Sequence, residues 1–280
     1  MQIINTIEEI RGLIKTWKTE GMTIGLVPTM GYLHAGHKSL IDKAVSENRR
    51  VVVSNFVNPI QFGENEDLSS YPRNLEQDAA LCENAGADIM FCPKPEEMYY
   101  PDKCTFVDMN QLTKGLCGKT RPVHFSGVCT VVTKLFNIVT PDRAYFGEKD
   151  AQQLAVIKRM VRDLNFGLTV VGCPIVREAD GLALSSRNTY LNMEERKAAL
   201  ILNSALTKGK EMINSGETNA EKIKELIVNT LLTEPLARID YVEIVDGENL
   251  EPVEQVSKST LIAIAVLIGK TRLIDNVQYR

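Results

Sequence analysis

The chain has 280 residues and a formal net charge of −4, from 32 Lys and Arg against 36 Asp and Glu. Hydrophobic residues make up 44% and charged residues 24%, which are ordinary globular values and exclude collagen, disorder and coiled coil. The mildly acidic balance argues against a protein whose main task is to bind nucleic acid, because such proteins usually present a basic face. The length allows one large domain or two ordinary ones.

A membrane span and a secretory leader are both disfavoured. The longest clean apolar run, 261–268, is strand-sized and too short to cross a bilayer. The first 17 residues carry acids where a signal peptide needs Lys or Arg. The six cysteines include no CxxC pair, which disfavours a zinc ribbon, a redox dithiol and a disulfide framework. We expect reduced, mostly packed thiols in a cytoplasmic protein.

The first half alternates β-rich runs with amphipathic stretches. A strand is predicted at 23–27, ended by Pro28, and the almost continuously apolar run 50–57 predicts a buried one. Further strands are predicted at 88–91, 143–146 and 168–171. Helices are predicted from apolar spacing at 36–48, 75–85, 126–139 and 150–164. The alternation predicts an α/β fold with a Rossmann-like, doubly wound parallel sheet and right-handed crossovers.

After about Val176 the pattern changes. Two Lys/Glu-rich amphipathic helices are predicted at 194–215 and 219–233, and strands follow at 239–245, 260–268 and 273–277. Helices grouped first and strands second favour a separate α+β domain. We expect a catalytic domain over 1–175 and a smaller α+β domain over 176–280 that covers the site, with the boundary inside 172–187.

The strongest local signal, 28–37, runs from the end of a predicted strand into a predicted helix. The chain has only three histidines, and His34 and His37 lie within four residues of each other. Ligands of open α/β sheets bind outside the carboxyl ends of the strands, and a helix N-terminus there suits phosphate. Two imidazoles would add cationic donors. The alternatives are a metal half-site, two unrelated surface histidines, and an anion-binding turn without catalysis.

Three further blocks occupy comparable positions. The block 147–153 is a second strand-to-helix junction, where Lys149 offers a point charge and Asp150 a helix N-cap. The block 180–188 combines serine hydroxyls with an arginine, which suits phosphate. The block 58–63 follows a predicted buried strand with neutral amides, which suit a hydroxyl or a carboxylate. Each of these, taken singly, is also compatible with an ordinary turn.

Together the blocks resemble the pantothenate synthetase family, also called pantoate–β-alanine ligase. The segments that carry the resemblance are PTMGYLHAGH at 28–37, NFVNPIQFGENEDLSSYPRN at 55–74, RPVHFSGVCTVVTKLFNIV at 121–139, PDRAYFGEKDAQQLAVIKRMVRDL at 141–164 and VREADGLALSSRN at 176–188. HxGH alone is shared with many nucleotidyltransferases and with one class of aminoacyl-tRNA synthetases. GEKDxQQ, NPxQF and LSSRN in this order are far more specific.

The resemblance implies an ATP-dependent ligase of pantothenate biosynthesis. The carboxylate of pantoate would attack the α-phosphorus of ATP, giving pantoyl adenylate and pyrophosphate. The amine of β-alanine would then attack the acyl carbon and release AMP. Mg²⁺ and a homodimer are further implications, and neither a nucleic acid nor a membrane is expected as a partner. A mixed anhydride must be kept from water, so we expect a closing element, either 63–70 or the second domain.

The resemblance also implies roles for individual residues. His34, His37 and Lys149 would be catalytic, with His37 as proton donor. ATP would be bound by Met30, Gly31, Tyr32, Leu33, His34, Ala35, Gly36, His37, Gly147, Glu148, Lys149, Asp150, Val176, Leu184, Ser185, Ser186 and Arg187. Pantoate and β-alanine would contact Gln61, Gln153, Asn58 and Arg121.

Two residues depart from the pattern or lie outside it. The acidic pair that usually follows YPR near Mg²⁺ reads Gln77-Asp78 here, which leaves Asp78 as the candidate metal ligand. His124, in the RPVHF segment, is interpreted as a structural donor rather than a catalytic group.

Two other functions stay open. An adenylyltransferase could use the same HxGH to couple ATP to a phosphorylated acceptor. That acceptor's phosphate calls for an extra basic residue near Gln61, whereas the sequence places neutral amides there. A regulatory protein would bind ATP without turnover.

Overall fold

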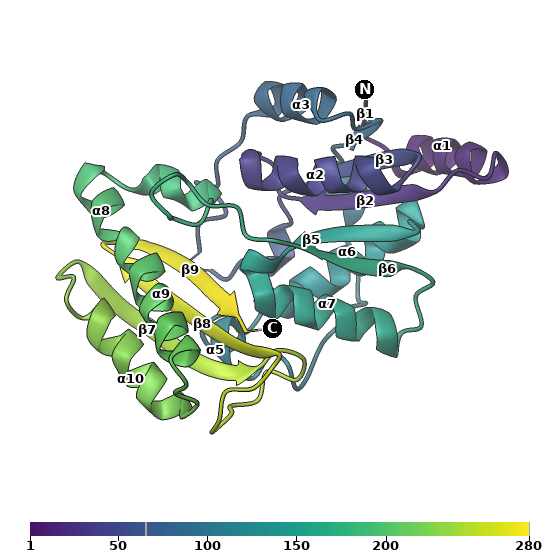
Figure 1. Ribbon diagram of the computed structural model, residues 1–280. Coiled ribbons are helices and arrows are strands. Elements are labelled where there is room, and N and C mark those ends of the chain that lie inside the picture. Colours follow the sequence, from purple (N-terminus) through teal and green to yellow (C-terminus); the bar gives the residue numbers. More distant parts are fainter. Residues whose placement is uncertain (65, 280) are drawn as a thin grey trace.

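The structure is a computed structural model that describes residues 1–64 and 66–279. It contains two sheets, each with its own helices (Figure 1). The larger sheet has six parallel strands in the order β1-β4-β3-β2-β5-β6, and the smaller has three antiparallel strands in the order β7-β8-β9. The predicted α/β fold with a smaller α+β part is therefore confirmed. The domain boundary at 175/176 stays a prediction.

The elements are as follows. The six-stranded sheet consists of β1 (Gln2–Ile4), β2 (Ile24–Thr29), β3 (Arg50–Asn55), β4 (Ile89–Phe91), β5 (Arg143–Gly147) and β6 (Thr169–Cys173). The helices and 3-10 turns in the same part of the chain are α1 (Ile7–Thr19), α2 (Ala35–Glu47), η1 (Pro59–Gln61), α3 (Leu75–Asn84), α4 (Pro95–Met98), α5 (Leu116–Thr120), α6 (His124–Val139), η2 (Glu148–Asp150) and α7 (Ala151–Asp163). The remaining elements are η3 (Ser186–Tyr190), α8 (Met193–Ala198), α9 (Leu200–Asn214), α10 (Ala220–Leu231), β7 (Ala237–Asp246), β8 (Thr260–Ile268) and β9 (Thr271–Gln278).

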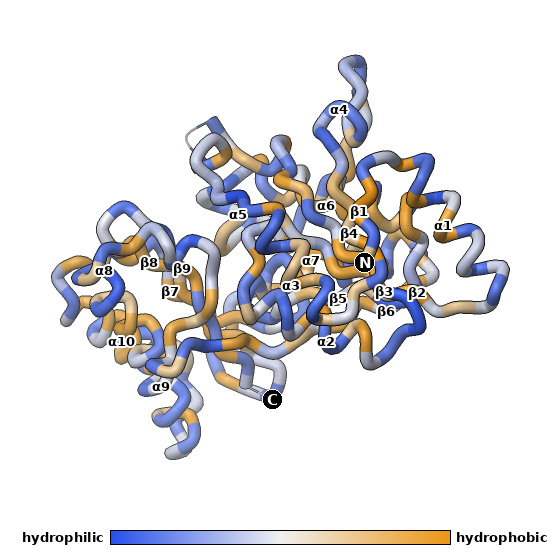
Figure 2. The backbone as a smooth tube through the Cα atoms, turned by 90° about the horizontal axis from the view of Figure 1, so that it is seen from above, coloured by the Kyte–Doolittle hydropathy of each residue, from blue (hydrophilic) through white to orange (hydrophobic). Residues whose placement is uncertain are grey.

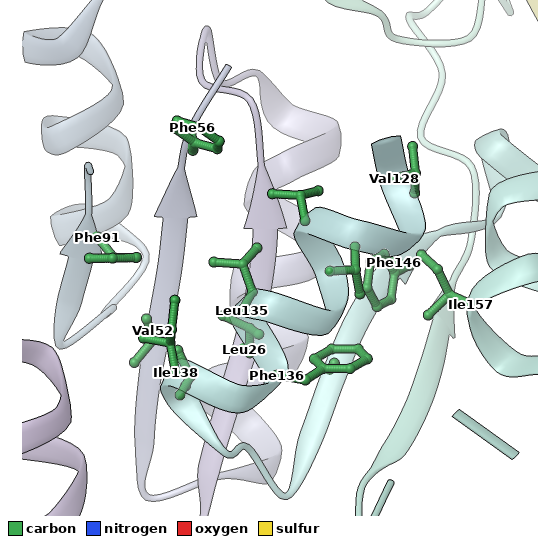
Figure 3. Packing of buried hydrophobic residues seen from close by; sticks show 14 of the residues in the cluster. Leu26, Val52, Phe56, Phe91, Val128, Leu135, Phe136, Ile138, Phe146 and Ile157 are labelled. Carbon is green, nitrogen blue, oxygen red and sulfur yellow. The ribbon is translucent and has the colours of Figure 1, made fainter. Parts of the chain in front are cut away.

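Helices cover both faces of the larger sheet. α2 and α3 pack on one face, and α1, α6 and α7 pack on the other. Figure 3 shows Leu135 and Ile138 of α6 lying near Leu26 of β2 and Val52 of β3. Most residues of α6 are buried, because it lies between the sheet and neighbouring helices. Figure 2 shows hydrophilic segments along the outer helices and turns.

The structure corrects the predicted end of the first long strand. β2 continues through Pro28 to Thr29. The Thr29 carbonyl accepts from the Phe56 N–H on the β3 side, so strand alternation turns the Pro28 nitrogen toward β5. β5 pairs only with Gly25 and Leu26 of β2. The nitrogen of Pro28 has no hydrogen to donate, and at this position no neighbouring strand needs a hydrogen bond from it.

Two further differences concern helices and the N-terminus. The predicted helix at 194–215 is two helices, α8 and α9, separated at the buried Ala199, where the Leu202 N–H bonds three residues back to the Ala199 carbonyl. The edge strand β1 and the helix α1 were not predicted. α1 is amphipathic, with an N-cap at Thr6 and a buried Trp17 near its end.

The direction of strand order reverses between β2 and β5, since β3 and β4 lie on one side and β6 on the other. The carboxyl ends of β2 and β5 are followed by α2 and by η2 with α7, so the N-termini of these elements meet at the switch point. The smaller sheet approaches the same place. Asn276 of β9 donates from Nδ2 to the carbonyl oxygens of Glu148 and Lys149, at 3.0 and 2.8 Å.

Within the described residues, no helix is long and apolar enough to cross a membrane. All six cysteines are free, and Cys82, Cys117, Cys129 and Cys173 are buried, as expected for packed thiols.

Candidate active site

Two adjoining cavities lie at the switch point. The smaller, of about 230 Å³, is lined by residues from all four sequence blocks. The larger, of about 1060 Å³, lies between the two sheets and their helices. The residues that line both are Arg121, His124, Lys149, Asp150, Gln153, Ser185 and Arg187. The two cavities therefore form one continuous site with an inner and an outer part.

The histidine pair lies at the start of α2, in the wall of the inner cavity. The Nδ1 of His34 accepts the Gly36 N–H at 3.1 Å, and the Nδ1 of His37 accepts the His34 N–H at 3.3 Å. The ring centroids are 4.1 Å apart. A ring nitrogen that accepts a backbone N–H carries no proton, so each neutral ring holds its proton on Nε2. Each imidazole is thus an N–H donor.

Both imidazoles are neutral in the ligand-free protein at pH 7. Burial, followed by the charge of Lys149, lowers the pKa of His34 to about 4. Burial, with smaller contributions from His34 and Lys149, lowers the pKa of His37 to about 3. The expectation of cationic donors is therefore wrong for this state. The pair supplies neutral hydrogen-bond donors beside the positive charge of Lys149.

The turn that positions the histidines is held by Asp78, which is 1% exposed. Its carboxylate accepts from the N–H groups of Tyr32 and Leu33, at 2.9 and 2.6 Å, and from Asn55 Nδ2 at 2.8 Å. Gly31 has φ +82° there, and a Cβ would meet the Asn55 side-chain oxygen. Asp78 lines neither cavity, and this placement favours a structural role over the predicted metal contact.

Most predicted ATP-binding residues line the inner cavity: Met30, His34, Gly36, His37, Gly147, Lys149, Asp150, Val176, Leu184, Ser185, Ser186 and Arg187. The others, Gly31, Tyr32, Leu33, Ala35 and Glu148, do not line it. They belong to the turns that carry the lining residues, and Leu33 is buried in the core between α2 and the sheet. The blocks predicted to bind one ligand are therefore brought together.

The predicted substrate amides also reach the inner cavity. Asn58 is fully engaged, since its Nδ2 donates to Gln61 Oε1 at 2.9 Å and to the Gly127 carbonyl at 3.1 Å, while its Oδ1 accepts from Tyr99 at 2.7 Å. Asn58 therefore positions Gln61 rather than offering a free amide. Gln153, on the first turn of α7, lines both cavities.

Two arginines of the site are paired with two adjacent acids. Arg121 donates from Nε and Nη2 to Glu66, at 2.9 and 2.5 Å. Arg187 donates from Nε and Nη2 to Asp67, at 3.0 and 2.8 Å. Burial opposes the charge of Glu66, but the hydrogen bond and charge of Arg121 outweigh it and hold the pKa of Glu66 below its usual range. Both acids therefore stay ionised at neutral pH.

No role was predicted for Glu66 or Asp67 as individual residues. They belong to 63–70, one of the two expected closing elements, of which Asn65 lies outside the described residues. Arg121 and Glu66 are 55 residues apart in the sequence, so no local pattern signals the pairing.

The structure also shows the surroundings of two more residues that line the inner cavity, His124 and Ser54. His124 places Nδ1 3.1 Å from the Gln61 carbonyl, and burial lowers its pKa to about 4. Nδ1–H is therefore the donor, which agrees with the expected structural role. The Ser54 hydroxyl, at the end of β3, is buried in the inner cavity wall and has no hydrogen-bond partner within the described residues.

The sequence matches the family described as pantoate-beta-alanine ligase over residues 2–278. A pantothenate synthetase of Clostridium acetobutylicum is 62% identical over 276 residues, which cover 99% of this chain and 98% of the relative. One of Enterococcus faecalis is 61% identical over 279 residues, covering 100% of this chain and 99% of the relative.

Solved structures agree with the sequence relatives. A pantothenate synthetase from Thermus thermophilus is 46% identical and superimposes with a TM-score of 0.95, with each chain covered completely. A pantoate-beta-alanine ligase from Francisella tularensis, complexed with beta-gamma ATP and beta-alanine, is 35% identical with a TM-score of 0.80, covering 99% of this chain and 97% of that one. The chain therefore belongs to the pantoate–β-alanine ligase family and is a ligase.

Proposed function

We propose that this chain condenses pantoate with β-alanine in an ATP-dependent reaction that passes through pantoyl adenylate and releases AMP and pyrophosphate. The observation that carries the proposal is the inner cavity, where His34, His37, Lys149, Gln61 and Gln153 come together at the switch point of the sheet. The ATP and β-alanine complex of the Francisella tularensis relative supports the same ligands here.

In this proposal the phosphates of ATP lie at the start of α2, facing the histidine pair and Lys149. Negative charge grows on the α-phosphate and on departing pyrophosphate while the pantoate carboxylate attacks. Donors already aimed at that position stabilise the transition state most, because they need no reorganisation. The Nε2–H groups of His34 and His37 are such donors, since their Nδ1 atoms are held by backbone N–H groups.

We assign His37 a hydrogen-bond role in place of the proton-donor role that the resemblance implies. Its burial and its neutral state mean that giving up the Nε2 proton would leave an imidazolate, which is not a feasible species in a buried site. Bound phosphate raises a neighbouring histidine's pKa. The hydrogen bond that Nδ1 of His37 accepts from the His34 N–H opposes this protonation, because a protonated Nδ1 could not accept it, and Nε2–H stays the group that faces the ligand.

Pantoate would occupy the part of the inner cavity between the amides and α6. Gln61 and Gln153 offer neutral hydrogen-bonding groups, which leave the attacking carboxylate nucleophilic. Val128, Val131 and Val132 of α6 form an apolar wall that suits the dimethyl carbon of pantoate. The acyl carbon would then lie between the phosphate donors and the amides, where the amine of β-alanine attacks it.

No group of three or more His, Cys, Asp and Glu side chains in the described residues could hold a metal ion. The described residues therefore do not form a Mg²⁺ cage of their own, and no step is assigned to a metal held by the protein alone. In this proposal Mg²⁺ accompanies the phosphates of ATP, which, with water, provide the oxygen ligands that it prefers. The homodimer, the cytoplasmic location and the closing element over the site stay predictions.

The test is an assay with ATP, Mg²⁺, pantoate and β-alanine in which AMP and pyrophosphate are followed. AMP formation should depend on both organic substrates, and pantoate alone should support exchange of labelled pyrophosphate into ATP. ATP binding without turnover would favour a regulatory protein. AMP formation that ignores either organic substrate would contradict the ligase mechanism.

A further inference from the structure

We propose that the ion pair of Arg121 and Glu66 is the β-alanine subsite, which takes its zwitterionic substrate by exchange of partners. The substrate's carboxylate replaces Glu66 on Arg121, and its ammonium group replaces Arg121 on Glu66. The inference rests on the proposed function, because it requires β-alanine as the second substrate.

The location of the pair fits this use. Arg121 is the C-cap of α5 and lines both cavities, while Glu66 follows η1 and lines the outer cavity. Their side chains are 17% and 22% exposed. The pair is thus partly desolvated but reachable from the outer cavity, and Arg121 lies where the two cavities meet.

The charges explain why a zwitterion is favoured. A simple carboxylate that took Arg121 would leave Glu66 ionised, partly buried and unpaired, and a simple amine would leave Arg121 in the same state. Unpaired charges of this kind are strongly unfavourable. A substrate with both charges gives each of the two residues a new partner. The Arg121 guanidinium can donate two hydrogen bonds to the substrate carboxylate, as it now does to Glu66.

The surroundings support exchange at this pair. The neighbouring Arg187 already has Asp67 as its own partner. His124, one turn after Arg121, is neutral and bonds to the carbonyl of Gln61. The backbone N–H of His124 also donates to the Arg121 carbonyl at 3.1 Å. The subsite is therefore tied directly to Gln61, beside which the acyl carbon would lie.

The test is Glu66→Gln, which keeps the side chain's shape and removes its charge. We expect the KM for β-alanine to rise about tenfold, the lower end of the range for losing a hydrogen bond to a charged group, because the pair is partly exposed. Propionate, which is β-alanine without the amine, should inhibit Glu66→Gln several-fold more strongly than the wild type, since Arg121 is released and no acid is left unpaired.

These opposite shifts separate the proposal from its rivals. If Glu66 merely blocked Arg121, the variant would bind β-alanine more tightly. If the pair were purely structural, both ligands would change in the same direction or not at all. Either result, an unchanged or lowered KM for β-alanine or an unchanged propionate inhibition, overturns the proposal.

Two controls keep the readout specific. Glu64→Gln removes the same charge from the same loop at an exposed side chain that has no partner within the described residues, and it should leave both ligands unaffected. Pantoate-dependent pyrophosphate exchange, measured without β-alanine, should still occur in Glu66→Gln, which would show that the variant is folded and forms the adenylate. Absence of exchange in the wild type refutes the proposed function. Normal exchange with unshifted β-alanine values refutes the subsite alone.

Discussion

The two ring nitrogens of His37 have different roles in the structure, and substitution can separate them. Nδ1 accepts the backbone N–H of His34, while Nε2–H faces the inner cavity. His37→Asn offers an amide oxygen close to the position of Nδ1 but nothing at Nε2. His37→Gln reaches the position of Nε2 with an uncharged N–H donor. His37→Ala removes both.

The expected magnitudes follow from the burial of this donor. Losing one preorganised donor to a developing oxyanion lowers the rate by about 10²- to 10³-fold, which is about 2.7–4 kcal/mol. We expect losses of that size in His37→Asn and His37→Ala. His37→Gln should stay within about tenfold of the wild type, because hydrogen-bond donation is retained without any titratable group.

The assay is pantoate-dependent pyrophosphate exchange, with ATP affinity and melting temperature measured for each variant. These two controls show whether the start of α2 is preserved. If His37→Gln is as inactive as His37→Ala while ATP still binds, then catalysis needs an imidazole that titrates. The assignment of a neutral donor would then be refuted, and the proton-donor role would stand.

Three further predictions test the site from other directions. In the ligand-free protein, imidazole NMR spectra should show all three histidines neutral at pH 6. Burial lowers the pKa values of His34, His37 and His124 to about 4, 3 and 4. A histidine that titrates near 6.5 would contradict this prediction. Unfolded histidines take up protons first, so the free energy of unfolding should fall as the pH drops from 6.5 towards 4, by up to about 1.4 kcal/mol per pH unit for each histidine. Gly127→Ala places a Cβ 2.5 Å from the Gln61 Cα. We therefore expect the free energy of unfolding, measured with denaturant, to fall by about 1–3 kcal/mol and the KM for pantoate to rise. The control is Gly12→Ala, whose Cβ would have no atom within 4 Å and which should destabilise neither the fold nor the site. Asp78→Asn should lower the free energy of unfolding by about 1–3 kcal/mol, because an amide nitrogen would face an N–H donor of the turn. The same variant should leave the Mg²⁺ dependence of turnover unchanged. A shifted Mg²⁺ requirement in a stable variant would restore the metal role.

Local pattern was sufficient for most of the larger sheet, for physical reasons. Buried parallel strands such as β3 are almost continuously apolar, and helices such as α7 show apolar residues at helical spacing, so both are visible without tertiary information. The short edge strand β1 has only three residues and no such signal. Pro28 was misleading because its tolerance depends on which flank of β2 is paired, a property of the sheet and not of the strand.

The site residues likewise fall into those that the sequence could place and those that it could not. The order of strands and helices was sufficient to place His34, His37 and Lys149 at one crevice, since successive βα junctions converge at the carboxyl edge of a parallel sheet. The hydrogen bonds of Asp78 were not visible in the sequence, because they join it to residues 45 and 46 positions away.

The sequence by itself determined the fold class, the family and the residue types that meet at the switch point, because periodicity and motif spacing are local properties. Only the tertiary structure decided the neutral state and tautomer of the histidines, the hydrogen bonds between Asp78 and the turn before α2, and the pairing of Arg121 with Glu66. Each of these depends on burial or on contacts between distant parts of the chain, and those quantities exist only once the chain is folded.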